Sequence, residues 1–161
     1  MINLFCSTIA QEVQNLALIS DEEDIELTEK LQFTDFPFLE DKKTIRWIKQ
    51  NRIIFIMRGL PGSGKSTLVK ILSKVYKGQN PKVCSADHYF INESGDYVFN
   101  PAFLKDAHES SQDKMKSFVQ DGQPLVIVDN TNVEHWEMRP YFMVWIAQCG
   151  NFRIFCHSDF T

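Results

Sequence analysis

Residues 59–66 constrain the fold of this chain more than any other segment. They read G-L-P-G-S-G-K-S and fill the pattern G-x-x-x-x-G-K-[ST]. The apolar run at 53–57 before them predicts a buried strand, and apolar residues at helical spacing from Leu68 to Val75 follow them. A strand, a glycine-rich turn and a helix in this order indicate a phosphate-binding loop, the P-loop.

The residue types in this loop fit phosphate chemistry. Glycines at 59, 62 and 64 permit backbone conformations and a close approach that a Cβ atom would block, so that successive N–H groups can converge on phosphate oxygens. The charge of Lys65 would meet the β- and γ-phosphates, and the Ser66 hydroxyl would ligate Mg²⁺ at the positive end of the helix. We therefore expect the nucleotide to be bound by Gly62, Ser63, Gly64, Lys65, Ser66 and Thr67.

Length and charge limit the domain organisation. A chain of 161 residues with 43% apolar residues can bury one substantial core, and this composition excludes a chain that is disordered throughout. Residues 1–40 hold nine Asp and Glu against Lys30 alone, whereas residues 41–161 are mildly basic. We predict a partly flexible acidic leader at 1–40 and an α/β domain at 41–161. The weak basic charge permits a nucleic-acid end as substrate without requiring one.

Strand and helix patterns alternate along the predicted domain. Further strands are predicted at 81–86, 125–128 and 152–156, with Gly78 as the C-cap of the helix before the first of them. A hairpin is predicted at 89–99, and a helix begins at Asn100-Pro101 with an apolar stripe. A last helix carries Pro140, which should kink it or begin a second segment. The alternation predicts a three-layer α/β fold with a sheet covered on both faces.

The apolar stripe of the helix after Asn100 comprises Phe103, Leu104, Ala107, Met115, Phe118 and Val119. That of the last helix comprises Trp136, Met138, Phe142, Trp145 and Ile146. Earlier in the chain, a short helix is predicted at 44–51. The apolar residues just before it, Phe33, Phe36, Phe38 and Leu39, are either core anchors or a binding surface.

Two carboxylates follow predicted strands directly. Ligands of parallel sheets gather beyond the carboxyl ends of the strands, which makes Asp87 and Asp129 the candidates. Asp129 would hold Mg²⁺ together with Ser66, or else begin a turn, and Asp87 would accept the proton of an acceptor hydroxyl, or else cap a helix. Asn132 would hold a loop or touch substrate. Arg139 would grip an acceptor phosphate or be a solvated helix residue.

Cysteine, histidine and hydropathy patterns point to an intracellular protein. The four cysteines form no C-x-x-C pair, and Cys84 and Cys156 fall in predicted strands, as buried thiols of a reduced protein do. The four histidines show no metal-binding spacing. We see no signal peptide and no apolar run of membrane-spanning length, and we expect a cytoplasmic monomer.

These motifs together resemble the P-loop polynucleotide 5′-hydroxyl kinase family. The similarity is greatest to the kinase-like domains of animal 2′,3′-cyclic-nucleotide 3′-phosphodiesterases. It rests on R-G-L-P-G-S-G-K-S-T-L at 58–68, S-A-D at 85–87 and V-D-N-T-N at 128–132, and on W-E-M-R-P-Y at 136–141, which is similar to kinase-like modules of ubiquitin-ligase-binding proteins. The resemblance implies strand order 2-3-1-4, a nucleoside triphosphate (ATP or GTP) with Mg²⁺ at Ser66 and Asp129, and Asp87 as general base toward a 5′-hydroxyl end of RNA or DNA.

The chain departs from this family in three ways. Some members carry an arginine three residues after the general base, where this chain has Phe90. The family's arginine-bearing lid follows the fourth strand, and we expect the domain to end before it, at residue 161. Paired H-x-T motifs do not occur in these residues. Three functions stay open: a polynucleotide 5′-kinase, a kinase for a small metabolite, and a nucleotide-binding module without catalysis.

Overall fold

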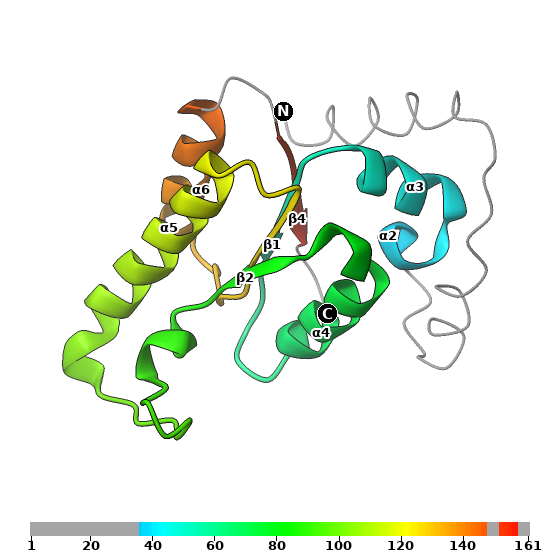
Figure 1. Ribbon diagram of the computed structural model, residues 1–161. Coiled ribbons are helices and arrows are strands. Elements are labelled where there is room, and N and C mark those ends of the chain that lie inside the picture. The colour runs from blue at the N-terminus through cyan, green and yellow to red at the C-terminus, as the bar shows by residue number, and fades with distance from the viewer. Residues whose placement is uncertain (1–35, 148–151, 158–161) are drawn as a thin grey trace. The chain divides into compact units, whose positions relative to one another are not determined.

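A computed structural model describes residues 36–147 and 152–157 (Figure 1). Its internal contacts divide the chain between Asn51 and Arg52 into two compact units. The predicted division at residue 40 stays a prediction, because residues 1–35 lie outside the described part. Cys6, Phe33 and Cys149 lie outside it too.

Residues 36–51, the described part of the N-terminal unit, contain two short helices, α2 at Pro37–Glu40 and α3 at Lys42–Gln50. Asp41 caps α3, since its carboxylate accepts hydrogen bonds from the Thr44 N–H at 2.8 Å and from the Thr44 hydroxyl at 2.7 Å. Phe38 and Leu39 are buried, as the core alternative for these residues predicted. The helix predicted at 44–51 therefore forms, and it begins two residues earlier because Asp41 is its cap.

The second unit is built on a four-stranded parallel sheet. Its strands are β1 at Ile53–Met57, β2 at Lys82–Cys84, β3 at Leu125–Val128 and β4 at Arg153–His157. Their order is β2-β3-β1-β4, and Ile53 pairs with Leu125 on one side and Arg153 on the other. This confirms the strand order that the family resemblance implied.

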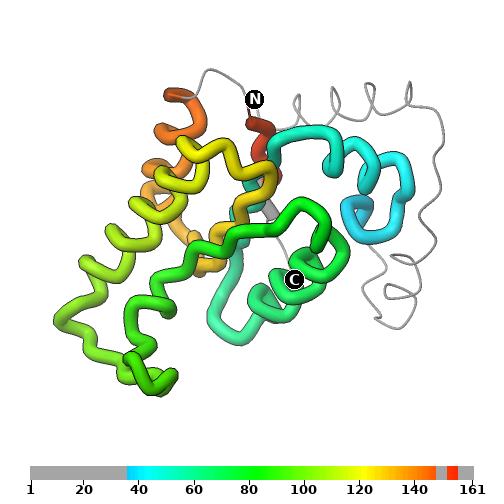
Figure 2. The backbone as a smooth tube through the Cα atoms, in the orientation of Figure 1, coloured from blue at the N-terminus to red at the C-terminus, as the bar shows by residue number. Residues whose placement is uncertain are grey.

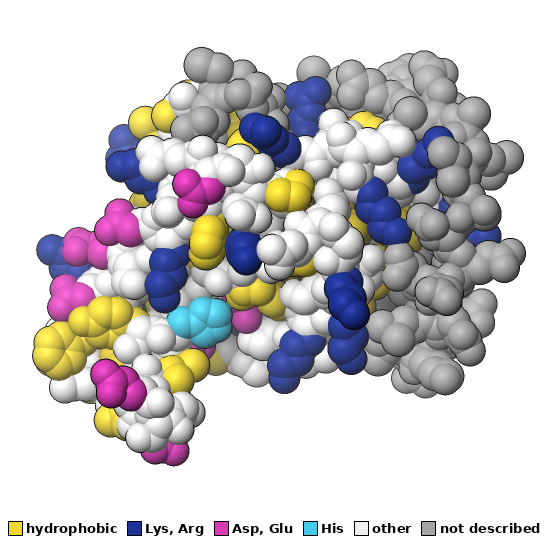
Figure 3. Space-filling model, viewed as in Figure 1, with side chains coloured by type: hydrophobic (Ala, Val, Ile, Leu, Met, Phe, Trp, Pro, Cys, Tyr) yellow, Lys and Arg dark blue, Asp and Glu magenta, His cyan; other side chains and the backbone are white. Residues whose placement is uncertain are grey.

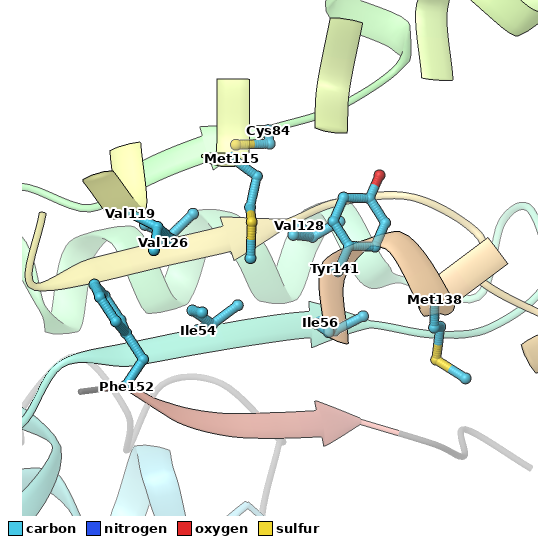
Figure 4. Close-up of a cluster of buried hydrophobic side chains, with 10 residues drawn as sticks. All are labelled: Ile54, Ile56, Cys84, Met115, Val119, Val126, Val128, Met138, Tyr141 and Phe152. Carbon is cyan, nitrogen blue, oxygen red and sulfur yellow. The ribbon is translucent and has the colours of Figure 1, made fainter. Parts of the chain in front are cut away.

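Helices cover both faces of this sheet. On one face, α5 at Leu104–Gln120 and α6 at His135–Ala147 pack against side chains that alternate along β1 and β3. Figure 4 shows this core, which comprises Ile54, Ile56, Cys84, Met115, Val119, Val126, Val128, Met138, Tyr141 and Phe152. On the other face, Phe55 contacts Tyr76, which directly follows α4 at Lys65–Val75. The predicted three-layer fold is confirmed.

The chain between β2 and α5 makes an excursion, which we define as residues 87–103. It starts with a short 3-10 helix, η2 at Asp87–Phe90, continues through an antiparallel bridge between Ile91 and Tyr97, and ends in η3 at Pro101–Phe103. The bridge confirms the predicted hairpin. Figure 2 shows the excursion projecting from the end of β2 and returning beside the first turns of α5.

Several sequence-based expectations for the helices were wrong in detail. Helix α4 ends at Val75 and leads into η1 at Lys77–Gln79, so Gly78 is not its C-cap, and the left-handed residue that ends this turn is Asn80. Strand β2 is shorter than predicted, and α6 runs through Pro140 as one helix.

The buried faces of α5 and α6 also differ from the predicted stripes. Phe103 ends η3 and Leu104 begins α5, and both are exposed because this end of α5 extends past the sheet. Ser111 is buried between Ala107 and Met115. On α6, Trp136 and Ile146 are exposed. Cys84 is fully buried as predicted, and this burial raises the pKa of its thiol to about 12. No helix in the described ranges is long and apolar enough to cross a membrane.

Candidate active site

The P-loop occupies the turn between β1 and α4. Gly59, Gly62 and Gly64 all have positive φ angles, of 147°, 80° and 88°. A Cβ atom on Gly59 would lie 2.8 Å from the Ser63 hydroxyl oxygen. The glycines predicted to permit the loop are therefore required by its backbone, and Gly64 directly precedes α4, so that the positive end of this helix faces the loop.

Lys65 is buried, and its ammonium group is held by the loop itself. Nζ donates hydrogen bonds to the carbonyl oxygens of Gly59 at 2.9 Å and Leu60 at 2.7 Å, and to the Ser63 hydroxyl at 3.5 Å. The charge is thus positioned against the loop in advance. Ser66 and Thr67, which follow in the first turn of α4, are exposed.

Three hydrogen bonds tie the base of the P-loop to the segment after β3. The Gly59 N–H donates to the Thr131 carbonyl at 2.8 Å, the Asn132 side chain donates to the Met57 carbonyl at 2.7 Å, and the Arg58 guanidinium donates to the Val133 carbonyl at 2.7 Å. Asn132 is buried with a φ of 47°, so the structure places it in the loop-holding alternative. Arg58 was missed as a site residue, although its position beside the first P-loop glycine is a usable signal.

Asp129 follows β3 and lies close to residues that follow two other strands, β1 and β2. Its carboxylate accepts a hydrogen bond from the Ser66 hydroxyl and lies within electrostatic range of Lys65 and Asp87. Burial raises the pKa of the Asp129 carboxyl, with the Asp87 charge acting in the same direction, and Ser66 and Lys65 oppose the shift. The structure thus assembles four of the residues that sequence reasoning selected.

Asp87 is exposed at the start of η2. The Tyr97 hydroxyl donates to one of its carboxylate oxygens at 3.3 Å, and the Asp87 N–H donates to the Ser85 hydroxyl at 3.2 Å. An exposed carboxylate beside the phosphate-binding residues is open to an incoming hydroxyl group. Arg139 is exposed on α6 and makes no hydrogen bond or ion pair with the described residues, so its role stays a prediction.

A buried polar network supports both acidic strand ends, and sequence reasoning missed it. The Asn130 side-chain oxygen accepts from the Ala86 N–H at 2.9 Å, and its amide donates to the Tyr141 hydroxyl at 2.9 Å and to the Ser111 hydroxyl at 3.2 Å. Asn130 directly follows Asp129, and its side chain bonds to Ala86, which directly precedes Asp87. Its bonds to Ser111 and Tyr141 anchor both strand ends to α5 and α6. Buried and satisfied networks of this kind hold loops in one arrangement.

The oxygen atoms at this point fit a magnesium ion. Mg²⁺ prefers oxygen ligands and is commonly held by one or two carboxylates together with substrate phosphates. The Ser66 hydroxyl and the Asp129 carboxylate are oxygen donors that could serve in this way, and they contact each other. Within 36–147 and 152–157, no three His, Cys, Asp or Glu side chains are grouped to hold a metal by themselves. A magnesium ion here would take its further ligands from phosphate oxygens and water.

Gly64→Ala is expected to weaken nucleotide binding by about tenfold or more, because a Cβ atom would stand where phosphate oxygens approach the loop. Gly95→Ala in the excursion is the matched control, since Gly95 has a φ of 87° against 88° for Gly64 and neither Cβ atom would meet protein atoms. Both substitutions should cost about 1–2 kcal/mol of stability through backbone strain. Calorimetric titration with ATP measures the difference; equal affinities in the two variants would contradict a phosphate at Gly64.

Asp129→Asn is expected to raise the melting temperature of the ligand-free protein at neutral pH. The folded protein holds the Asp129 proton more tightly than the unfolded chain does, so this stability is present at acidic pH and is lost as the pH rises through the raised pKa. The asparagine amide has no charge to desolvate. The gap between variant and parent should therefore widen as the pH rises from the ordinary carboxyl value of 3.8 toward neutrality.

Thermal melts in the presence of a chelator measure this gap. The control is Asp113→Asn, which removes an exposed carboxylate from α5 and should leave the melting temperature nearly unchanged at each pH. A variant at Asp129 that is less stable than the parent at neutral pH would show that its charge stabilises the fold instead.

Comparison with known proteins agrees with this geometry. A family model described as an AAA domain, AAA_33, matches residues 54–158. NEDD4-binding protein 2 of Homo sapiens is 41% identical over 92 residues, which are 55% of this chain and 5% of that protein. The 2′,3′-cyclic-nucleotide 3′-phosphodiesterase of Pongo abelii is 32% identical over 107 residues, 66% of this chain and 24% of that protein. The resemblance inferred from the motifs is confirmed by these matches.

The chain spans less than a quarter of the length of these two relatives. Among solved structures, a chain of the Pnkp1/Rnl/Hen1 complex aligns with a TM-score of 0.48 at 17% identity, over 68% of this chain and 36% of that chain. The family match covers the P-loop, both acidic strand ends and all of the segment between them. The chain therefore belongs to the AAA domain family of P-loop proteins that this model describes.

Proposed function

We propose that this chain transfers the γ-phosphate of ATP, or of GTP, to a 5′-hydroxyl end of RNA or DNA. One observation carries the proposal. Ser66 donates to Asp129 next to Lys65, while the second carboxylate, Asp87, lies within electrostatic range and is exposed. One acid is thus arranged for a cation and the other for an acceptor, which is the division of roles that a kinase needs.

The residues of the site divide the reaction between them. The P-loop N–H groups and Lys65 bind and orient the phosphates, and Asp87 accepts the proton as the acceptor oxygen bonds to the γ-phosphorus and the bond to the bridging oxygen of ADP breaks. Mg²⁺ bound at Ser66 and Asp129 would neutralise charge on the phosphates. Asn130 and Asn132 are buried and hold the strand ends in place through their bonds to the backbone of Ala86 and Met57.

The family relationship supports an acceptor that contains a nucleotide. One relative is named for its action on 2′,3′-cyclic nucleotides, and the matched region of that protein covers two thirds of this chain. We therefore propose a nucleic-acid end as the partner. We also propose that the protein works as a cytoplasmic monomer.

The test is transfer of label from γ-labelled ATP to a 5′-hydroxyl oligonucleotide. We expect label on this oligonucleotide and none on the same oligonucleotide with a 5′-phosphate, since the latter offers no hydroxyl at that end. Nucleotide binding without transfer to any acceptor would leave a nucleotide-binding module, and transfer to metabolite alcohols alone would indicate a small-metabolite kinase. Either result would overturn the proposal.

A further inference from the structure

The excursion and the first residue of α5 carry most of the exposed large hydrophobic side chains of the described residues. Eleven large hydrophobic side chains are exposed in the described ranges, and seven of them lie between residues 89 and 104. Figure 3 shows these hydrophobic side chains gathered at the lower left, over the excursion and the first turn of α5. A grouping of this kind marks a binding surface more often than scattered single residues do. Its members are Tyr89, Ile91, Tyr97, Val98, Phe99, Phe103 and Leu104.

Three of these side chains are aromatic rings held by one buried ring. Phe90 is 6% exposed, and it meets Tyr89, Tyr97 and Phe99 edge to face at centroid distances of 5.6, 6.1 and 5.0 Å. Despite this packing the three rings stay 42%, 55% and 52% exposed. They are therefore fixed in position and still open to a ligand, so that binding would cost little side-chain entropy.

The aromatic cluster of Tyr89, Tyr97 and Phe99 adjoins Asp87, the proposed general base. The Tyr97 hydroxyl donates to Asp87 at 3.3 Å, and Tyr89 lies two residues after Asp87 in the same short helix. A nucleotide that presents its 5′-hydroxyl to Asp87 would have its base beside these rings. The cluster thus continues the site already described.

The charge of this segment does not favour recognition through phosphate groups. Residues 83–104 contain no Lys or Arg, and they carry Asp87, Glu93 and Asp96. A nucleic-acid strand has no lysine or arginine of this segment to pair with its phosphates, and the nearest one along the chain after it, Lys105, lies 3.7 Å from Glu109. The uncharged faces of nucleobases are the part of a strand that suits this surface.

We propose that Tyr89, Tyr97 and Phe99 form a stacking surface for the first nucleobases of a single-stranded acceptor. This inference rests on the proposed function and adds how the acceptor is recognised: by the faces of its bases, with little preference among the four bases and little dependence on salt. The excursion thereby places the terminal hydroxyl at Asp87.

Steady-state transfer from ATP to a 5′-hydroxyl oligonucleotide tests this surface through Phe99. Phe99→Leu, which keeps an apolar side chain but removes the ring, should raise the KM for the oligonucleotide by about tenfold. It should leave kcat and the KM for ATP unchanged. Phe99→Tyr, which keeps a ring, should retain the parental KM. Met143→Ala, an exposed apolar residue on α6, is the control and should have no effect.

A second experiment uses an acceptor oligonucleotide whose first nucleotides lack their bases. The parent enzyme should bind it about tenfold more weakly than the intact oligonucleotide, and Phe99→Leu should add no further loss. Melting temperatures check that each variant is folded, and Tyr89→Ala repeats the measurement at a second ring. Unchanged oligonucleotide KM values in Phe99→Leu and Tyr89→Ala would overturn the stacking surface while leaving the kinase intact.

A binding measurement tests the stacking surface even if the proposed kinase activity is absent. If the parent transfers no label, fluorescence anisotropy of a labelled single strand still measures the surface. Binding that Phe99→Leu weakens and Phe99→Tyr preserves would support stacking, and absence of binding would overturn it. Phe99-dependent association of the protein with itself, without strand binding, would show that the surface contacts another protein and would also overturn the proposal.

Discussion

Lys65→Ala is expected to reduce phosphoryl transfer by about 10²–10³-fold, the cost of removing one positioned donor from developing charge. The Lys65 ammonium is held by two loop carbonyls at 2.9 and 2.7 Å, and it lies within electrostatic range of Asp129. It is thus in place before a triphosphate binds and needs little reorganisation. The measurement is kcat/KM for transfer from ATP to a 5′-hydroxyl oligonucleotide.

Two further variants define the role of this lysine. Lys70→Ala removes an exposed lysine from the same helix and should leave transfer unchanged. Lys65→Arg keeps the charge but replaces a compact ammonium with a planar guanidinium, which cannot take the same pair of carbonyl contacts, so it should not restore activity. Transfer by Lys65→Ala within twofold of the parent would show that the P-loop charge is not used.

Asp87→Asn is expected to lower kcat by about 10²–10⁴-fold, the usual contribution of a general base, with the ATP affinity unchanged. Asp87 is exposed and contacts the Tyr97 hydroxyl, a bond that an asparagine oxygen can also accept, so the fold should be preserved. The Asp87 charge contributes to the raised pKa of Asp129. Its removal makes Asp129 easier to ionise but also removes a negative charge near the proposed cation site, so transfer is measured at saturating Mg²⁺.

Glu93→Gln is the matched control for this variant. Glu93 is exposed in the same excursion, and its substitution removes the same charge without touching the strand end. Single-turnover rates and ATP titrations should show full activity for Glu93→Gln and lost turnover with retained binding for Asp87→Asn. Equal turnover in Asp87→Asn and the parent would remove Asp87 from the mechanism.

The elements predicted best from sequence are those built from local signals. Strands β1 and β3 are continuous apolar runs buried on both faces, and the P-loop is a contiguous pattern between one of them and its helix. The exposure of Phe103 and Leu104 could not be predicted, because both fit the apolar stripe of α5. These two side chains have no surface to pack on because the first turns of α5 lie beyond the sheet.

The residues that support the site likewise depend on tertiary contacts that local sequence does not reveal. Arg58 bonds to Val133 across 75 positions, and Asn130 bonds to Ala86 across 44. Asn130 belongs to the V-D-N-T-N motif, but nothing in this local pattern indicates its bonds to Ala86, Ser111 and Tyr141. Its role depends on β2 and β3 being neighbours, and on α5 and α6 bringing Ser111 and Tyr141 to the same buried place.

The amino-acid sequence alone determined that this protein has a strand, a P-loop and a helix, because glycine spacing and apolar periodicity act within a few residues. Tertiary structure decided which strand ends meet, and therefore that Asp129 reaches Ser66 and that the rings around Phe90 adjoin Asp87. Those contacts depend on strand order, and strand order is set by packing between segments that lie far apart in the chain.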